Sequence, residues 1–241
     1  MYHQVGKFEP MKTHRASYCD VDAFRSHMAL LKLLQVKVLS MDELMLVLSG
    51  KQAMPKRAAL LTFDDACLNF MENALPILQE YGYPAIVYAI ASMAGGDAQW
   101  LAADGHPTPP LMTFEQLRFI QSEGIDVGSH SYSHVHLASL PYEKQLHELS
   151  ESKRILEQEL GKEVRHFCYP YGSYNADTLK AAERAGYVTA MTCERAAATP
   201  DNDLLALPRK AISYGDNRVG FAWKLYFKNE PKTPILSRDS I

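Results

Sequence analysis

One pattern recurs along the sequence and limits the folds that it can adopt: a helical stretch ends at a glycine, and a short apolar stretch follows. It occurs in LQEYGYPAIVYAI, IQSEGIDVGSH and AERAGYVTAMT, around Gly82, Gly124 and Gly186. Glycine suits the left-handed residue that ends a helix, and the apolar run after it suits a buried strand. Strands that alternate with helices of this length favour a parallel sheet with helices outside it, open or closed into a barrel. We therefore expect an α/β fold.

Other local signals fit the same alternation. SMDE (Ser40–Glu43) and TFEQ (Thr113–Gln116) have the form of capping boxes that begin helices. A later helical stretch carries an apolar stripe beneath a charged face, formed by Leu146, Leu149, Leu156 and Leu160. The 241 residues, of which 47% are hydrophobic, suffice for one domain. We assign it to residues 1–227, with 228–241 as a C-terminal tail and 95–111 as the longest insertion without a helix or strand pattern.

Composition excludes several functions and cofactors. The formal net charge of −3 provides no basic surface for nucleic acid. The four cysteines form no C-x-x-C pair, which argues against a zinc ribbon or a redox pair and favours reduced thiols. The sequence begins without an apolar signal segment and contains no apolar run of about 18 residues. On this basis we expect a cytoplasmic protein.

The segment LLTFDDACLNF, residues 60–70, places two carboxylates directly after an apolar strand. Neighbouring side chains of a strand point to opposite faces, so at least one of Asp64 and Asp65 should face the interior. Burial of a bare carboxylate is costly and calls for a cationic partner, a metal ion or a raised pKa. A helix N-cap and its neighbour would also explain the pair.

A second polar cluster, in GSHSYSHVHL, follows another short strand. His130 and His134 are four residues apart and can converge if the chain turns helically after the strand. Together with one aspartate they would supply the three ligands of an open catalytic zinc site, and the second aspartate could then act as a base. His136 should point away from such a site. Solvated loop histidines are the alternative.

These residues resemble a known family. LTFDDA, GSHSYSHVHL and RHFCYPYGSYN are similar to motifs of the NodB-type polysaccharide deacetylases, carbohydrate esterase family four, and the resemblance extends over about residues 2–212. It implies a distorted (β/α) barrel in a single domain that removes N-acetyl groups from amino sugars with a divalent metal. By this likeness Asp64 is the general base, and Asp65, His130 and His134 bind the metal. We expect one zinc ion, which cobalt, nickel or manganese could replace.

The resemblance also assigns the YPYG segment to the substrate. Its residues, Tyr169, Pro170, Tyr171 and Gly172, would form one wall of the groove. The backbone N–H of Tyr171 would help to stabilise the oxyanion of the reaction. A turn with an aromatic packing residue is the alternative.

The chain departs from the family pattern at two of these motifs. Ala66 follows the paired aspartates where members commonly have glycine. Cys168 stands where many members carry the arginine that orients the base. Arg209, in LALPRKAI, is the candidate replacement, although it could also be a surface arginine.

A third departure concerns the general acid. Many members supply it from a late histidine, but this chain has no histidine after His166. The opening MYHQVG resembles the start of the exopolysaccharide deacetylase branch, which acts on poly-N-acetylglucosamine and has a circularly permuted barrel. That likeness assigns the acid to His3, which could otherwise be a frayed terminal residue.

The expected function is metal-dependent N-deacetylation of N-acetylhexosamine units in a bacterial envelope glycan, exopolysaccharide or lipid-linked precursor. The alternatives are a non-catalytic glycan-binding relative and a metal-dependent hydrolase of another C–N bond, such as a sugar formamide. The expected partner is an N-acetylated glycan or glycolipid. Residues 217–230 alternate aromatic and basic side chains, so this segment either contacts an anionic membrane surface or packs against the barrel.

Overall fold

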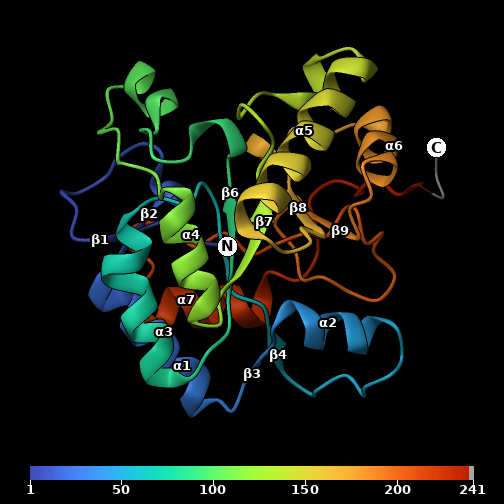
Figure 1. The fold of residues 1–241 in the computed structure, drawn as a ribbon. Helices are drawn as coiled ribbons and strands as arrows, with labels where there is room; N and C mark the ends of the chain where they lie inside the picture. The colour runs from blue at the N-terminus through green and yellow to red at the C-terminus, as the bar shows by residue number, and fades with distance from the viewer. Residues whose placement is uncertain (239–241) are drawn as a thin grey trace.

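The computed structural model of the protein describes residues 1–238, except for the side chains of 103 and 104. At its centre is a parallel five-stranded sheet in the order β5-β6-β7-β8-β9 (Figure 1). Its strands are β5 (Thr62–Phe63), β6 (Ile86–Ala89), β7 (Asp126–Ser129), β8 (His166–Cys168) and β9 (Thr189–Met191). Two parallel pairs lie outside it, β1 (Gln4–Gly6) with β2 (Tyr18–Asp20) and β3 (Lys37–Val38) with β4 (Ala58–Ala59).

The five strands curl into half of a barrel, and less regular segments at its two edges close the barrel. On one edge, the Tyr2 amide donates to the Thr62 carbonyl at 2.8 Å. On the other edge, the Leu207 amide donates to the carbonyl of Ala190 at 2.9 Å. The two segments then join each other, because the Ile212 amide donates to the Met1 carbonyl at 3.0 Å. The predicted distorted α/β barrel is confirmed.

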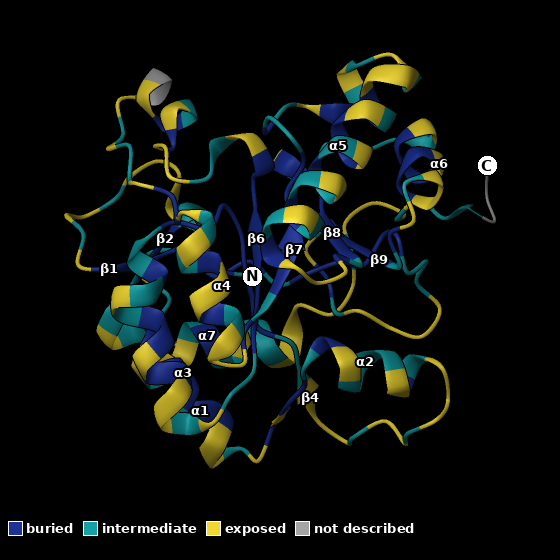
Figure 2. Ribbon diagram, in the orientation of Figure 1, coloured by how far each residue is buried: buried dark blue, intermediate teal, exposed yellow. Residues whose placement is uncertain are grey.

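The helices surround the sheet and expose their outer faces (Figure 2). They are α1 (Val21–Leu33), α2 (Met41–Leu48), α3 (Leu75–Tyr81), α4 (Phe114–Ser122), α5 (Tyr142–Leu160), α6 (Ala176–Arg184) and α7 (Arg218–Phe227). Both predicted capping boxes are present, at the start of α2 and of α4. The predicted glycines follow α3, α4 and α6 with positive φ angles of 64°, 85° and 80° for Gly82, Gly124 and Gly186.

The core lies between the sheet and this layer of helices. Phe63, Val87 and Phe167 of the strands are buried to within 1% exposure, as are Leu149 and Leu156 from the stripe of α5. Each such side chain contributes about 1.5–3 kcal/mol of hydrophobic stabilisation. Because the strands are covered on both faces, they read as short apolar runs rather than as alternating patterns.

The insertion 95–111 is more ordered than the sequence suggests. It contains a 3₁₀ helix (Gln99–Asp104), and bridges join Asp97 to Pro110 and Leu111 to Cys67. Leu101 and Leu111 are buried with Ile90 in a small apolar cluster. Apolar contacts therefore hold this segment against the carboxyl end of β6.

The segment predicted as a tail, 228–241, is described as far as Arg238, and its last three residues lie outside the described residues. Arg238 donates to Asp203 at 2.8 Å, and the Ala197 amide donates to the Asn229 carbonyl at 3.0 Å. In the described part of the chain, no helix combines the length and the apolar character needed to cross a bilayer.

Candidate metal and catalytic site

The paired aspartates lie directly after β5, at the carboxyl end of the sheet. Asp64 is 2% exposed and Asp65 is 7% exposed, so both carboxylates are buried. The strand ends at Phe63, and the chain then turns at Asp65, which has a left-handed backbone with φ of 74°. This change of direction lets adjacent side chains face the same site, which a continuous strand would not allow.

The two histidines come from the loop after β7. We expected a helical turn between them, but the chain takes left-handed conformations at Ser131 (φ 66°) and His134 (φ 56°) instead. The His134 amide donates to the Ser131 hydroxyl at 2.9 Å and holds this turn. The rings of His130 and His134 converge with centroids 5.0 Å apart.

Asp65, His130 and His134 form a three-residue set that can hold a metal ion. One oxygen, Asp65 Oδ1, lies 3.3 Å from His130 Nε2 and 3.4 Å from His134 Nε2. The Nδ1 of His130 donates to the Cys168 carbonyl at 2.8 Å, which leaves Nε2 with its lone pair directed at Asp65. Burial lowers the pKa of His134 even though Asp65 opposes this effect, so the neutral, metal-binding imidazole is favoured.

The donor set therefore fits a divalent ion. Two imidazoles and one carboxylate are the ligand types of catalytic zinc sites. The contacts given above pair the buried Asp65 carboxylate with imidazoles and with no arginine or lysine, so a bound cation would balance its charge. Burial opposes ionisation of Asp65, yet His130 and His134 hold its pKa well below the ordinary 3.8 when their Nε2 atoms carry protons and donate to it, and a bound cation would take over this role once those atoms are ligands.

Asp64 has a different partner. Arg209 donates to both of its oxygens, with Nη1 to Oδ1 at 2.6 Å and Nη2 to Oδ2 at 2.8 Å. Burial alone would raise the pKa of Asp64, but the charge and hydrogen bonds of Arg209 lower it to about 2. The predicted replacement arginine thus lies on the predicted base, and it is 6% exposed rather than on the surface.

His3 and Cys168 complete the surroundings of Asp64. His3 comes from the first segment of the barrel, and its Nε2 lies 3.8 Å from Asp64 Oδ2. The Cys168 thiol donates to the same oxygen at 3.5 Å, and Arg209 Nη2 lies 3.0 Å from its sulfur. Cys168 therefore lies directly beside Arg209, the arginine that contacts Asp64 from another part of the chain.

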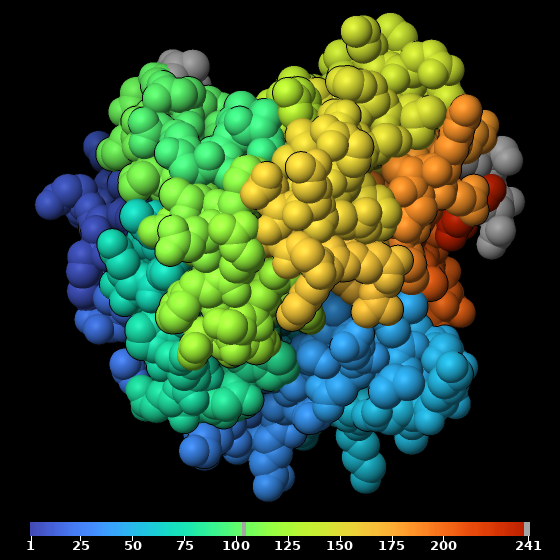
Figure 3. Space-filling model, in the orientation of Figure 1, coloured from blue at the N-terminus to red at the C-terminus, as the bar shows by residue number. Residues whose placement is uncertain are grey.

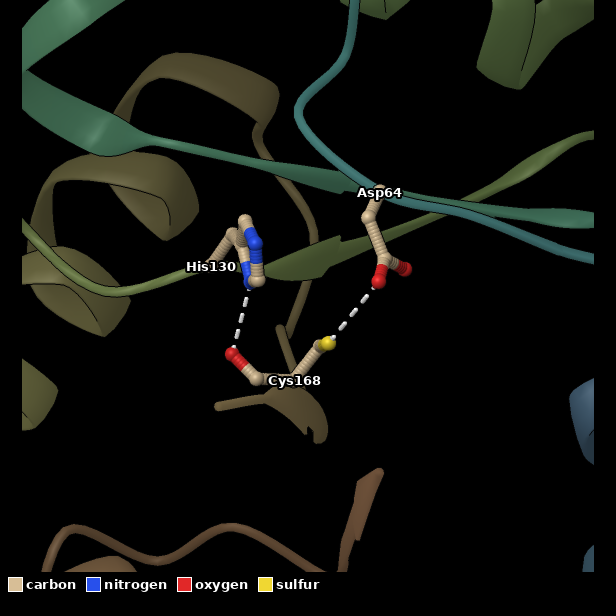
Figure 4. Close-up of side chains that lie close together, drawn as sticks. All are labelled: Asp64, His130 and Cys168. Carbon is tan, nitrogen blue, oxygen red and sulfur yellow. Dashed lines mark hydrogen bonds between the residues drawn. The ribbon is translucent and has the colours of Figure 1, made fainter. Parts of the chain in front are cut away.

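Asp64, His130 and Cys168 are also close enough to share a metal ion. Figure 4 shows Cys168 between the other two, with its carbonyl toward His130 and its thiol toward Asp64. The Arg209 guanidinium touches both Asp64 and Cys168, and a second cation there would meet its positive charge. Burial also raises the pKa of the Cys168 thiol, which disfavours a thiolate ligand. The set with Asp65 is the better metal site.

The YPYG segment follows β8 and divides between the core and the surface. Tyr169 and Pro170 are buried, and the Tyr169 hydroxyl donates to the Leu205 carbonyl at 2.9 Å. Tyr171 is 46% exposed, and its ring lies 4.6 Å from that of His134. Gly172 has φ of 67°, and a Cβ atom on it would lie 2.6 Å from that of Cys193. Tyr171 is therefore the most exposed side chain of this segment, and the predicted substrate wall stays a prediction.

Backbone strain is concentrated in these loops. Non-glycine residues with positive φ include Asp65, Ala66, Ser131, His134 and Tyr171. Each such conformation costs about 1–3 kcal/mol, which the surrounding structure must offset. At Ala66, φ of 55° explains why glycine is common in the resembling motif.

One residue of the site was absent from the sequence-based prediction. Trp100 lies in the insertion 95–111, and its ring is 4.2 Å from that of His134. The sequence offered only the presence of a tryptophan in a long loop, because the contact depends on how the insertion folds. His136, predicted as a non-ligand, stacks on Tyr171 at 4.1 Å and is outside the metal set.

The fold and the site define a class of protein: an α/β-barrel hydrolase that combines a metal-binding set of two histidines and an aspartate with a second, arginine-bound aspartate. Residues 51–190 match the model of the polysaccharide deacetylase family. The chain belongs to this family, and it is a metal-dependent carbohydrate N-deacetylase.

Individual relatives agree with this assignment. The poly-β-1,6-N-acetyl-D-glucosamine N-deacetylase of Staphylococcus epidermidis is 27% identical over 231 residues, covering 88% of this chain and 77% of that protein. The structure of the Streptococcus pyogenes deacetylase PplD is 26% identical, with a TM-score of 0.79 over 93% of this chain and 95% of that one. IcaB from Ammonifex degensii shares the fold at 19% identity, with a TM-score of 0.72 over 93% and 95% of the two chains.

Proposed function

We propose that the protein hydrolyses the acetamide of N-acetylglucosamine units in a β-1,6-linked glycan, either as a polymer or as a lipid-linked precursor, with zinc as its metal. The observation that carries this proposal is the pair of buried aspartates with separate partners, Asp64 on Arg209 and Asp65 on the histidines. The staphylococcal relative, named for this substrate, supports the choice of sugar.

The proposed mechanism assigns one task to each group. When bound by Asp65, His130 and His134, the divalent ion supplies Lewis-acid chemistry to the acetamide carbonyl and to water. Asp64, held ionised by Arg209, accepts the proton of the attacking water. The backbone N–H of Tyr171 donates to the developing oxyanion.

His3 is the proposed acid, because an amine leaves poorly as an anion and must be protonated. Its Nε2 lies 3.8 Å from Asp64 Oδ2, so the proposed acid and the proposed base lie next to each other in the site. C–N cleavage then gives acetate and a free amino sugar, with the proton of water transferred to the amine.

The arrangement also bears on the non-catalytic alternative. That alternative was based on Cys168 and on the lack of a late histidine. Arg209 contacts Asp64 in place of the missing arginine, and His3 lies beside the same carboxylate. The groups needed for turnover are therefore together, which supports catalysis over binding alone.

Acetate release tests the function. The purified protein, loaded with zinc, is incubated with β-1,6-linked N-acetylglucosamine oligomers, and acetate and free amine are measured. We expect both products in equal amounts, with loss of both after chelation and in Asp64→Asn. Formate from an N-formylated sugar without acetate from the oligomers would support the other hydrolase, and zinc binding without any product would refute the proposal.

We also propose a peripheral membrane contact through α7. Val219, Trp223 and Phe227 are 77%, 54% and 66% exposed and lie four residues apart on one helix face. Arg218 and Lys228 at the helix ends are exposed and basic, as suits an anionic lipid surface. On the opposite face Phe221 stacks on His27 at 4.2 Å, so the segment packs on the barrel and also exposes aromatic rings.

Co-sedimentation with phosphatidylcholine vesicles, with and without phosphatidylserine, tests this contact. Binding should require phosphatidylserine and should fall in Trp223→Ala and Lys228→Glu. Lys224 is a poor choice for the charge reversal, because its ammonium donates to the Ala211 carbonyl and to Asp216 within the fold. Equal sedimentation of the wild type and both variants would exclude the contact.

A further inference from the structure

A cavity of about 360 Å³ is lined by neither the metal-binding residues nor Asp64 and His3. Its walls are formed by α2 with the loop after it, by the residues that lead into β5, and by segment 207–212 together with α7. We call it the α2–α7 cavity. α2 and the following loop form an outer layer of the molecule (light blue, lower right in Figure 3). The volume lies within the range of about 300–1,000 Å³ that is typical of small-molecule sites.

The walls of this cavity are largely apolar. Leu44 and Leu48 of α2, Leu60 before β5 and Leu225 of α7 are among the residues that line it. All four are only partly buried. Side chains that border a cavity have no neighbours on that side and lose the dispersion contacts of a packed core. A ligand with a hydrocarbon chain would bury them, at about 25 cal/mol for each Å² of apolar surface.

The charged side chains along the cavity are all basic. Arg209, Lys210 and Lys224 line it, and no aspartate or glutamate does so in the described part of the chain. Two of the three cations have a carboxylate partner, since Arg209 contacts Asp64 at 2.6 Å and Lys224 contacts Asp216 at 2.5 Å. The cavity therefore combines apolar walls with positive charge.

Lys210 is the cation without a carboxylate partner. Within residues 1–238 its ammonium donates to two neutral oxygens, the Leu225 carbonyl at 2.8 Å and Asn229 Oδ1 at 2.6 Å, and it forms no ion pair. The side chain is half-buried, and burial lowers its pKa without a carboxylate to oppose the effect. A lysine ammonium has three donor hydrogens, so one is left for an anionic ligand.

We propose that the α2–α7 cavity binds a long-chain fatty acid, with its hydrocarbon chain among the leucines and its carboxylate on Lys210. One chain with one anionic group matches an apolar cavity with one unpaired cation. The hydrogen bonds of an ammonium to a carboxylate are stronger than those to neutral oxygens, so the ligand completes the interactions of Lys210. This site is separate from the deacetylation reaction and gives the protein a second ligand.

The cavity is open to the outside of the molecule. Met54, in the loop after α2, lines it and is 51% exposed. Phe221 of α7 also lines it, whereas Trp223 and Phe227 of the same helix are 54% and 66% exposed. A fatty acid at a membrane surface in contact with α7 would therefore lie close to the cavity.

A structural role would explain these features without a ligand. Lys210 would then only join α7 to segment 207–212, and the cavity would be a gap in the packing. The two roles differ in what a larger side chain does. Filling a packing gap raises stability and changes nothing else, whereas filling a ligand site abolishes binding.

The binding test titrates the full chain with cis-parinaric acid, a fatty acid whose fluorescence rises in an apolar environment. We expect saturable binding of one probe per chain, with displacement by dodecanoate. Leu44→Trp and Leu48→Phe narrow the cavity and should each weaken binding about tenfold or more, as overpacking costs about 1–3 kcal/mol. Circular dichroism identifies the variants that keep the fold.

The charge test compares dodecanoate with dodecanol. Lys210→Met should weaken dodecanoate binding about tenfold or more, the effect of one hydrogen bond to a charged group, and should leave dodecanol binding unchanged. Lys210→Arg should retain most of the affinity. Lys180→Met, which removes an exposed lysine of α6, is the matched control.

Three outcomes would overturn the proposal. One is probe fluorescence that does not saturate, or equal affinity in the wild type, Leu48→Phe and Lys210→Met. Another is loss of binding in Trp223→Ala, which would place the probe on the outer face of α7. The third is displacement by lysophosphatidic acid but not by dodecanoate, which would assign the cavity to a phospholipid. None of these measurements depends on acetate release, so they leave the proposed function unaffected.

Discussion

The contact between Arg209 and Asp64 allows a quantitative prediction for Arg209→Met. Arg209 is the main reason that the pKa of Asp64 falls from its ordinary 3.8 to about 2 despite burial. At about 1.4 kcal/mol per pKa unit, this shift stabilises the folded protein by about 2.5 kcal/mol. Removal of the arginine also leaves burial of the carboxylate unopposed. We expect the variant to lose about 3–5 kcal/mol of unfolding free energy near neutral pH, as when one partner of a buried ion pair is removed.

The pH dependence of the loss follows from the two pKa values. In the wild type the folded pKa is below the unfolded one, so the stabilisation is complete above pH 3.8 and is lost as the pH falls toward 2. In the variant the folded pKa should exceed 3.8, so its stability falls as the pH rises through that value. The difference in unfolding free energy should therefore be greatest near neutral pH and should narrow in acid.

Urea unfolding followed by circular dichroism measures this difference. Chelator in all samples removes any contribution of metal binding. Asp64→Asn combined with Arg209→Met should recover much of the stability, because the buried charge is gone. Arg195→Met, which removes an exposed arginine of the neighbouring loop, is the matched control. A loss that is independent of pH, and equal with Asn at position 64, would show that Arg209 acts only through packing.

Three further predictions concern individual side chains. Asp64→Asn should retain zinc and lose turnover by about a hundredfold or more, whereas Asp65→Asn should weaken zinc affinity; exchanged phenotypes, by metal analysis and kinetics, would reverse the two roles. His3→Ala should keep the fold and the metal and lose turnover on the amide by about 10² to 10⁴, while sparing an aryl acetate, whose leaving group needs little protonation; equal losses on both substrates would place the acid elsewhere. Burial lowers the pKa of His27 from 6.5 to about 4, so the unfolded chain takes up a proton first as the pH falls, and the wild type should lose about 1.4 kcal/mol per pH unit in this interval. His27→Gln should lack that slope in urea unfolding, and an unchanged slope would assign it to other groups.

Local chemistry made the alternation of helices and strands and the two polar clusters predictable, whereas the closed barrel and the separate roles of Asp64 and Asp65 were implied by the family resemblance. Helix caps at Ser40 and Thr113 and the glycines after α3, α4 and α6 act within a few residues, so the alternation of helices and strands is readable from the sequence. Parallel strands end at one edge of a sheet, and polar residues after two of them were therefore expected to meet. The way in which Asp65 and His134 face the site was not predictable, because left-handed backbone at non-glycine residues has no local signal.

The contacts that tune the site depend on segments far apart in the chain. Arg209 and Asp64 are separated by 145 positions, and residue identity alone allowed Arg209 to be a surface arginine. Only closure of the barrel, with the last segment hydrogen bonded to the first, brings Arg209 and His3 to the same carboxylate. The sequence alone was enough to predict the candidate donors of a metal site and the alternation of strands and helices that carries them. Tertiary packing decided the charge on Asp64, the position of His3 beside it and the placement of Trp100, because each depends on distances and burial that exist only in the closed fold.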